Sequence, residues 1–143
     1  MPELLHDHDW QGGGRARVLV EASEWPAREA IELILRGAGY ATVACAGPEG
    51  SGQRCALAGG RGCAAAGEAD LVVHALRASD ARNLEALRAL RSRRPAVPVV
   101  VEAPPAVAER REDDFAGCTV IDAPLTPASL LEAVEQALAA TRR

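Results

Sequence analysis

The chain has 143 residues, which is enough for one compact domain but too few for two separate cores. Apolar residues make up 48% of it and aromatic residues only 3%, so the core must consist of Val, Leu, Ile and Ala. This composition excludes a disordered chain and suits a buried parallel sheet under helices. All 16 basic residues are arginine and the formal charge is −4, which excludes lysine chemistry and does not favour nucleic-acid binding.

The N-terminal segment is polar and ends in three glycines, Gly12-Gly13-Gly14. Because glycine resists a fixed backbone, we expect a flexible tail over residues 1–14 and a single domain over residues 15–143. The start has neither a basic nor an apolar leader region, and no stretch of about 18 apolar residues occurs. We therefore expect a cytoplasmic protein that does not span a membrane.

Apolar strand-like runs alternate with helical periodicity along the rest of the chain. The predicted strands are 17–21, 41–46, 70–76, 98–102 and 119–121. Helices are predicted to open at Pro26, near Asp80 and at Thr126-Pro127, with a weaker one over 106–115. This alternation implies right-handed crossovers, and hence a doubly wound α/β fold with a five-stranded parallel sheet. The one break is Gly47–Gly67, where a Gly- and Cys-rich insertion replaces or distorts the second helix.

Three stretches carry a family pattern without gaps. They are residues 17–40 with Arg28-Glu29-Ala30 and Gly39-Tyr40, residues 70–103 with Leu84-Glu85-Ala86-Leu87-Arg88, and residues 117–138 with Ala123-Pro124-Leu125-Thr126-Pro127. In these stretches the chain resembles the receiver domain of bacterial two-component response regulators, which act in phosphorelay signal transduction. The resemblance implies the receiver (flavodoxin-like) architecture with strand order 2-1-3-4-5. Only residues 41–69 fail to align.

The family's phosphorylation pocket is degenerate in this chain. In receivers, two acids after the first strand hold Mg²⁺, and an aspartate ending the third strand accepts the phosphoryl group. A hydroxyl residue and a lysine end the fourth and fifth strands. The resemblance puts these roles at Ala22, Ser23, Ala75, Ala103 and Ala123, none of which has the side chain that its role needs. A pseudo-receiver without phosphoryl transfer is therefore predicted.

Polar residues directly precede four of these positions: Glu21, His74, Glu102 and Asp122. All four would lie at the carboxyl ends of parallel strands, and strand alternation would turn them away from the phosphate pocket. They could bind a divalent metal or share a proton, and separate, partly solvated strand ends are the alternative. No nucleophile, cofactor motif or phosphate loop accompanies His74 with Glu21 or Glu102 as acid–base groups, so no enzyme is predicted.

Three cysteines, Cys45, Cys55 and Cys63, lie in or beside the insertion. Their spacing matches no zinc motif, but a loop can bring them together for metal binding or a reversible disulfide. Unlinked thiols in a tolerant loop are the alternative. Cys118 would lie at the opposite edge of the sheet, as a small packing residue.

Two charged segments complete the candidates. The run His6, Asp7, His8 and Asp9 could hold a transition metal weakly, with a solvated tail as the alternative. The end of the third helix carries Arg88, Arg91, Arg93 and Arg94, which could meet an acidic partner or nucleic acid, or face solvent.

The expected function is that of a stand-alone pseudo-receiver that binds another protein without phosphorylation control and without a cofactor. The resemblance points to the last helix and strands four and five, over Ala123–Ala139, as the surface for a partner or for a homodimer. A membrane partner is not expected. The alternative is a redox, metal or small-ligand sensor that uses the Cys-containing insertion or the polar strand ends.

Overall fold

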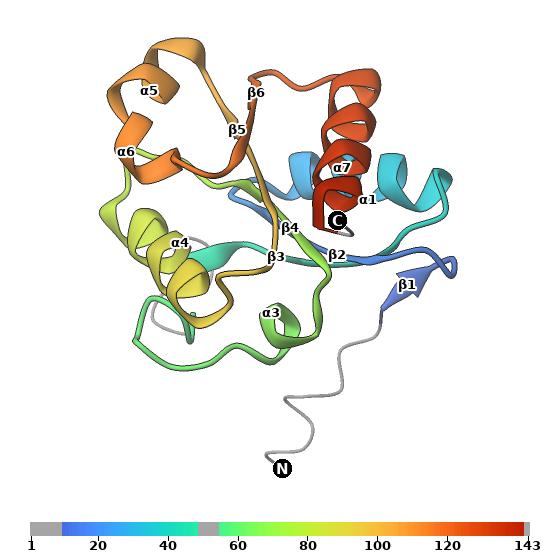
Figure 1. Cartoon of the computed structure of the whole chain (residues 1–143), viewed down its shortest axis with the longest axis horizontal. Helices are drawn as coiled ribbons and strands as arrows, with labels where there is room; N and C mark the ends of the chain where they lie inside the picture. Colours follow the sequence, from blue (N-terminus) through green and yellow to red (C-terminus); the bar gives the residue numbers. More distant parts are fainter. Residues whose placement is uncertain (1–9, 49–54, 142–143) are drawn as a thin grey trace.

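A computed structural model describes residues 10–48 and 55–141, and its centre is a six-stranded sheet with helices on both faces (Figure 1). The strands are β1 (Gln11–Gly12), β2 (Arg17–Ala22), β3 (Ala41–Cys45), β4 (Leu71–Ala75), β5 (Val99–Ala103) and β6 (Thr119–Asp122). Their order is β1-β3-β2-β4-β5-β6, and β2 to β6 run parallel. The five predicted strands, their order and the doubly wound α/β class are confirmed.

The extra strand β1 corrects the prediction of a five-stranded, all-parallel sheet. Its two residues pair antiparallel with Ala41 and Thr42 at the edge of β3. A Cβ at Gly12, which has φ +117°, would lie 2.5 Å from the Tyr40 carbonyl oxygen, so this close approach requires glycine. Gln11 and Gly12, which were expected to belong to a flexible tail, are therefore part of the sheet. Residues 1–9 lie outside the described residues.

Two long helices, α1 (Trp25–Gly37) and α7 (Pro127–Thr141), cover one face of the sheet. Pro26 lies in the first turn of α1, as predicted. At the start of α7, the Thr126 hydroxyl oxygen accepts the Ser129 N–H and the Ser129 hydroxyl oxygen accepts the Thr126 N–H. These reciprocal bonds satisfy two backbone donors and fix the point where the last helix begins.

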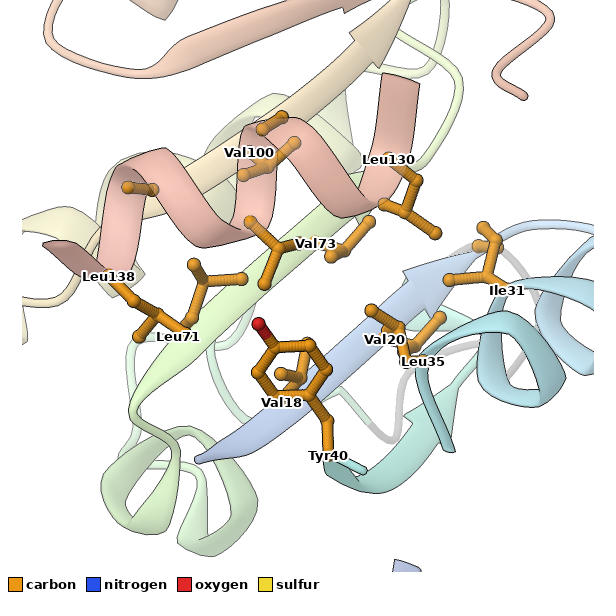
Figure 2. Packing of buried hydrophobic residues seen from close by; sticks show 14 residues of the cluster. Val18, Val20, Ile31, Leu35, Tyr40, Leu71, Val73, Val100, Leu130 and Leu138 are labelled. Atoms are coloured by element: carbon orange, nitrogen blue, oxygen red, sulfur yellow. The ribbon is translucent and has the colours of Figure 1, made fainter. Parts of the chain in front are cut away.

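The core on this face consists of aliphatic side chains from the central strands. Figure 2 shows alternate residues of β2, β4 and β5 meeting side chains of α1 and α7: Val18, Val20, Leu71, Val73 and Val100 against Ile31, Leu35, Leu130 and Leu138. Each of these residues is at most 7% exposed. Burial of this cluster between sheet and helices is the main source of stability on this face.

Shorter elements cover the other face: α3 (Ala64–Glu68), α4 (Ala81–Arg93), α5 (Pro105–Arg110) and α6 (Glu112–Phe115). The helix α4 opens after Asp80, whose carboxylate accepts the Arg82 N–H at 2.9 Å. The helix predicted over 106–115 is divided at Arg111 into α5 and α6, and the described part of the insertion after residue 54 contains the five-residue α3. Among the described helices, none is long and apolar enough to cross a membrane.

The arginines at the end of α4 bind the protein itself. Arg88 donates to the Asp114 carboxylate at 2.7 Å, Arg91 to the Asp114 carbonyl at 3.4 Å, Arg93 to the Gly60 carbonyl at 2.6 Å, and Arg94 to the Ala66 and Gly67 carbonyls at 2.6 Å each. These bonds join α4 to α6 on one side and to the insertion on the other. Contacts that stabilise the fold thus account for all four arginines.

Candidate functional site at the carboxyl edge of the sheet

The residues assigned to the degenerate phosphorylation pocket meet where the parallel strands end. Ala22 and Ala75 are register partners on β2 and β4. The Ala103 carbonyl at the end of β5 accepts the Ala123 N–H at 3.0 Å. Ser23 directly follows β2. The sheet therefore brings all five positions to one edge.

A cavity of about 290 Å³ opens between the ends of β4, β5 and β6. Ala75, Ala103 and Ala123 all line it, and Ala22 and Ser23 do not. Much of its wall is apolar and comes from the loop after β4 and from α5 and α6, including Leu76, Val107 and Phe115. Three strand-end alanines thus border one hollow.

The loop after β2 is fixed by a cation. Arg28 of α1 donates from Nη1 to the Ala22 carbonyl at 3.0 Å and to the Ser23 carbonyl at 3.2 Å. A guanidinium keeps its charge at any physiological pH. The Arg28 guanidinium therefore lies against the backbone of the loop at Ala22 and Ser23, the two positions assigned to the metal-binding acids.

A second arginine lies on the neighbouring loop after β4. Arg77 donates from Nη1 to the Glu24 carboxylate at 2.9 Å, and its N–H donates to the Ser23 hydroxyl oxygen at 3.3 Å. Both side chains of the ion pair are half-exposed or more, at 50% and 64%. The contacts tie the loops after β2 and β4 together beside the cavity.

One pair of the polar strand-end residues forms a buried contact. Glu21 and His74 are register partners on β2 and β4, and Glu21 Oε1 lies 3.0 Å from His74 Nδ1. Their side chains are 5% and 1% exposed. Glu21 is also the register partner of Cys45, so Cys45, Glu21 and His74 form one row across three strands. The row lies on the α3 and α4 side of the sheet, away from Ala22 and Ala75, as strand alternation predicts.

The other two polar strand-end residues are separate from this pair. His74 pairs with Val101, so Glu102 lies one position further along and on the opposite face, which is the face of Ala22 and Ala75. The Glu102 carboxylate accepts the Leu125 N–H at 2.8 Å. Asp122 is exposed at the end of β6. The expectation that all four face away from the pocket is therefore wrong for Glu102, because the register of β5 shifts it by one residue.

All four cysteines are free thiols. Desolvation is the first cause that raises the pKa of the Cys45, Cys63 and Cys118 thiols. The Glu21 carboxylate raises the pKa of Cys45 and Cys63 further, although Cys45 keeps contact with solvent. Cys118 packs against the core on the α4 side, near the start of β6. Protonated thiols are poor nucleophiles and poor metal ligands.

Metal-binding geometry is not found among residues 10–48 and 55–141, where no three His, Cys, Asp or Glu side chains converge on a point that could hold an ion. The candidate tail residues His6, Asp7, His8 and Asp9 lie outside the described residues. A divalent metal at this protein thus stays a prediction.

Sequence reasoning missed the residues that complete the site. Arg28 and Arg77 fix the loops, and Val107 and Phe115 close the cavity. An arginine in the first turns of the helix that follows β2 was the available signal for Arg28. The contribution of α6 carried no signal, because it depends on the break at Arg111.

This architecture also occurs in proteins of known structure. No family model and no curated protein sequence matches the chain. Solved structures do match: NtrX from Brucella abortus superposes with a TM-score of 0.69 at 22% identity, over 90% of this chain and 28% of that chain. A CheY-like response regulator receiver domain protein from Methanospirillum hungatei JF-1 superposes with a TM-score of 0.66 at 19% identity, over 90% of this chain and 98% of that one. This chain has the receiver fold.

The receiver fold accounts for most of the chain. A response regulator receiver protein from Sinorhizobium medicae WSM419 superposes with a TM-score of 0.66 at 23% identity, over 88% of this chain and 96% of that one. The chain spans 28% of the length of the NtrX chain, and 98% of the NtrX receiver domain taken alone. These likenesses establish the fold, and the roles of individual residues rest on the site itself.

Proposed function

We propose that this receiver-fold domain is a pseudo-receiver: a signalling module that binds another protein and works without phosphorylation. The observation that carries the proposal is the cavity bordered by Ala75, Ala103 and Ala123. Phosphoryl transfer to a receiver needs an attacking carboxylate and a metal that neutralises the developing charge. The acceptor position is Ala75, which has only a methyl group. The Arg28 guanidinium contacts the loop after β2, where receivers have their metal-binding acids.

The partner surface that we propose is the last helix, α7, with strands β5 and β6, over Ala123 to Ala139, and we add Val120 on β6 to it. The inner side of α7 is used by the core through Leu130 and Leu138. On the outer side of α7, Glu135 and Ala139 are exposed. Val120 on the edge strand β6 is 38% exposed and, as the register partner of Val101, lies on the face of the sheet opposite α7. An apolar residue on an exposed edge strand is a favourable anchor for a partner or a second copy.

Affinity capture from the native cell tests this proposal when wild type is compared with matched variants. We expect Val120→Asp to lose the partner, or to convert a homodimer to a monomer by light scattering. Leu33→Asp, a change at a 60% exposed leucine of α1 outside this surface, is the control and should keep the partner. Treatment with acetyl phosphate and Mg²⁺ should leave partner binding unchanged. Loss of binding in Leu33→Asp alone, or binding only after acetyl phosphate treatment, would contradict the proposal.

The redox form of a sensor is less well supported than the interaction module. Among the redox candidates Cys45, Cys55 and Cys63, a raised pKa keeps the Cys63 thiol protonated near neutral pH, and the thiolate is the reactive form. The pKa of Cys118, a packing residue outside this group, is raised as well. We expect both to react with iodoacetamide more slowly in the folded chain than in urea, and their rates in the folded chain to keep rising with pH beyond about 8.5, where the rate of an unperturbed thiol levels off. Mass spectrometry of digested samples measures this. Fast alkylation of Cys63 at pH 7 would restore the redox candidate.

Three further parts of the proposal remain predictions. We propose that the domain is not an enzyme, because the buried Glu21–His74 pair has no nucleophile beside it in an activated state. A cytoplasmic location fits a signalling role. We also propose that no cofactor is needed for partner binding, which dialysis against a chelator before the capture experiment would check.

A further inference from the structure

The cavity at the end of β4, β5 and β6 has the size of a small-molecule site. Its volume of about 290 Å³ is near the lower end of the range for ligand pockets, which is roughly 300–1,000 Å³. A cavity of this size admits a single ring or a short branched chain. It is bordered by the three alanines that stand where the receiver family has its acceptor, hydroxyl and lysine side chains.

The wall of the cavity combines apolar surface with a few polar groups. Leu76, Val107 and Phe115 supply apolar contacts, and both Phe115 and Ala103 are 4% exposed. The polar residues in the wall are Arg77, Ser79 and Glu102. A mostly apolar hollow with a small number of placed polar groups is the usual composition of a ligand site.

The charge around the cavity favours a cation. The Arg77 guanidinium is neutralised by Glu24 at 2.9 Å. Glu102 remains in the wall, with one carboxylate oxygen accepting the Leu125 N–H at 2.8 Å. Because Arg77 is paired with Glu24, Glu102 is the charged group of the wall that can face a ligand, and its carboxylate attracts a positively charged one.

We propose that this cavity binds a small organic cation with a flat or compact apolar body, such as an amine or an amidine. The apolar body lies against Phe115 and Val107, and the cationic group lies toward Glu102. The inference deepens the proposed function, because such a ligand would take the place of the phosphoryl group as the signal at the same edge of the sheet. The loops after β4 and β5, which border the cavity, would carry its effect to the surface.

Benzamidine is a suitable probe, with benzoate as its anionic counterpart of similar shape. In a titration followed by amide chemical shifts, benzamidine should bind with a Kd of about 1 mM. The shifts should centre on residues 75–79, 103–107 and 123. Benzoate should bind at least about fivefold more weakly, because its charge is opposite. Glu102→Gln keeps an acceptor for the Leu125 N–H, removes the charge and should weaken benzamidine by up to about fivefold.

Filling the cavity should abolish binding of the probe. Ala103→Leu and Ala123→Leu each place a larger side chain into it, and the second position is less buried and tolerates the change if the first does not fold. Ala30→Leu on the exposed side of α1 is the control and should bind like wild type. Equal binding of benzoate, no binding of benzamidine below about 10 mM, or full binding by both filled variants would overturn the inference. Phosphorylation by acetyl phosphate would instead overturn the proposed function, so the two failures are distinguishable.

Discussion

The two faces of the sheet differ in the helices that cover them and in the contacts that hold those helices. The face under α1 and α7 is a continuous aliphatic cluster beneath two helices of 13 and 15 residues. The opposite face has one long helix, α4, and short elements whose positions depend on arginine bonds to backbone carbonyls and on the buried Glu21–His74 contact. Regular packing makes the first face the scaffold, and the irregular second face carries α3, at the end of the insertion.

The largest expected effect belongs to the aliphatic face. Leu130 of α7 is fully buried in that cluster, so Leu130→Ala should lower the free energy of unfolding by about 2–5 kcal/mol through lost burial and a residual cavity. Leu33→Ala, at a 60% exposed position on α1, should change it by less than about 0.5 kcal/mol. Urea denaturation measures both. A small effect of Leu130→Ala would break the comparison, because this face would then not be the scaffold.

The buried polar pair tests the second face. Glu21→Leu and His74→Leu should each cost about 3 kcal/mol, because each leaves the other polar group buried without its partner. The double change to leucine should cost clearly less than the sum, since no polar group is then stranded. Glu21→Gln keeps a hydrogen-bond partner for His74 and should recover most of the loss. Additive costs in this double-mutant cycle would mean that the pair does not interact as described.

The arginine contacts of α4 should have a smaller effect. Arg94 donates to the Ala66 and Gly67 carbonyls, so Arg94→Met should loosen α3 and cost about 1–2 kcal/mol. Arg110→Met, at an exposed position of α5, is the matched control. Amide hydrogen exchange should show faster exchange in residues 57–69 for Arg94→Met only. Unchanged exchange there would show that the insertion is held by its apolar contacts alone.

The aliphatic face could be predicted from the sequence, and the opposite face only in part. Helical spacing and end signals at Pro26 and Thr126 locate α1 and α7, and β-branched runs locate the five parallel strands. The strand β1 escaped because two residues carry no periodicity. Gly12, one of the three glycines that suggested a loose tail, instead allows the chain to approach Tyr40 closely.

Strand alternation predicted only part of the candidate site. Alternation correctly places Glu21 and His74 together, since both precede the end of a strand and β2 and β4 pair in register. It fails for Glu102, because the register between β4 and β5 is decided by packing between strands and is not visible along one chain. The cavity was not foreseen for the same reason: its walls come from α5 and α6, whose division depends on tertiary contacts.

Intact mass measurement after incubation with acetyl phosphate and Mg²⁺ tests most directly our proposal that this receiver fold has no phosphoryl chemistry. A receiver domain that carries all five functional side chains serves as the positive control. We predict that the wild-type chain keeps its mass while the control gains one phosphoryl group. A hydroxylamine-sensitive phosphoryl adduct on the wild-type chain would contradict the account. If such an adduct still formed on the Glu21→Gln variant but not on the Glu102→Gln variant, Glu102 would be identified as the acceptor.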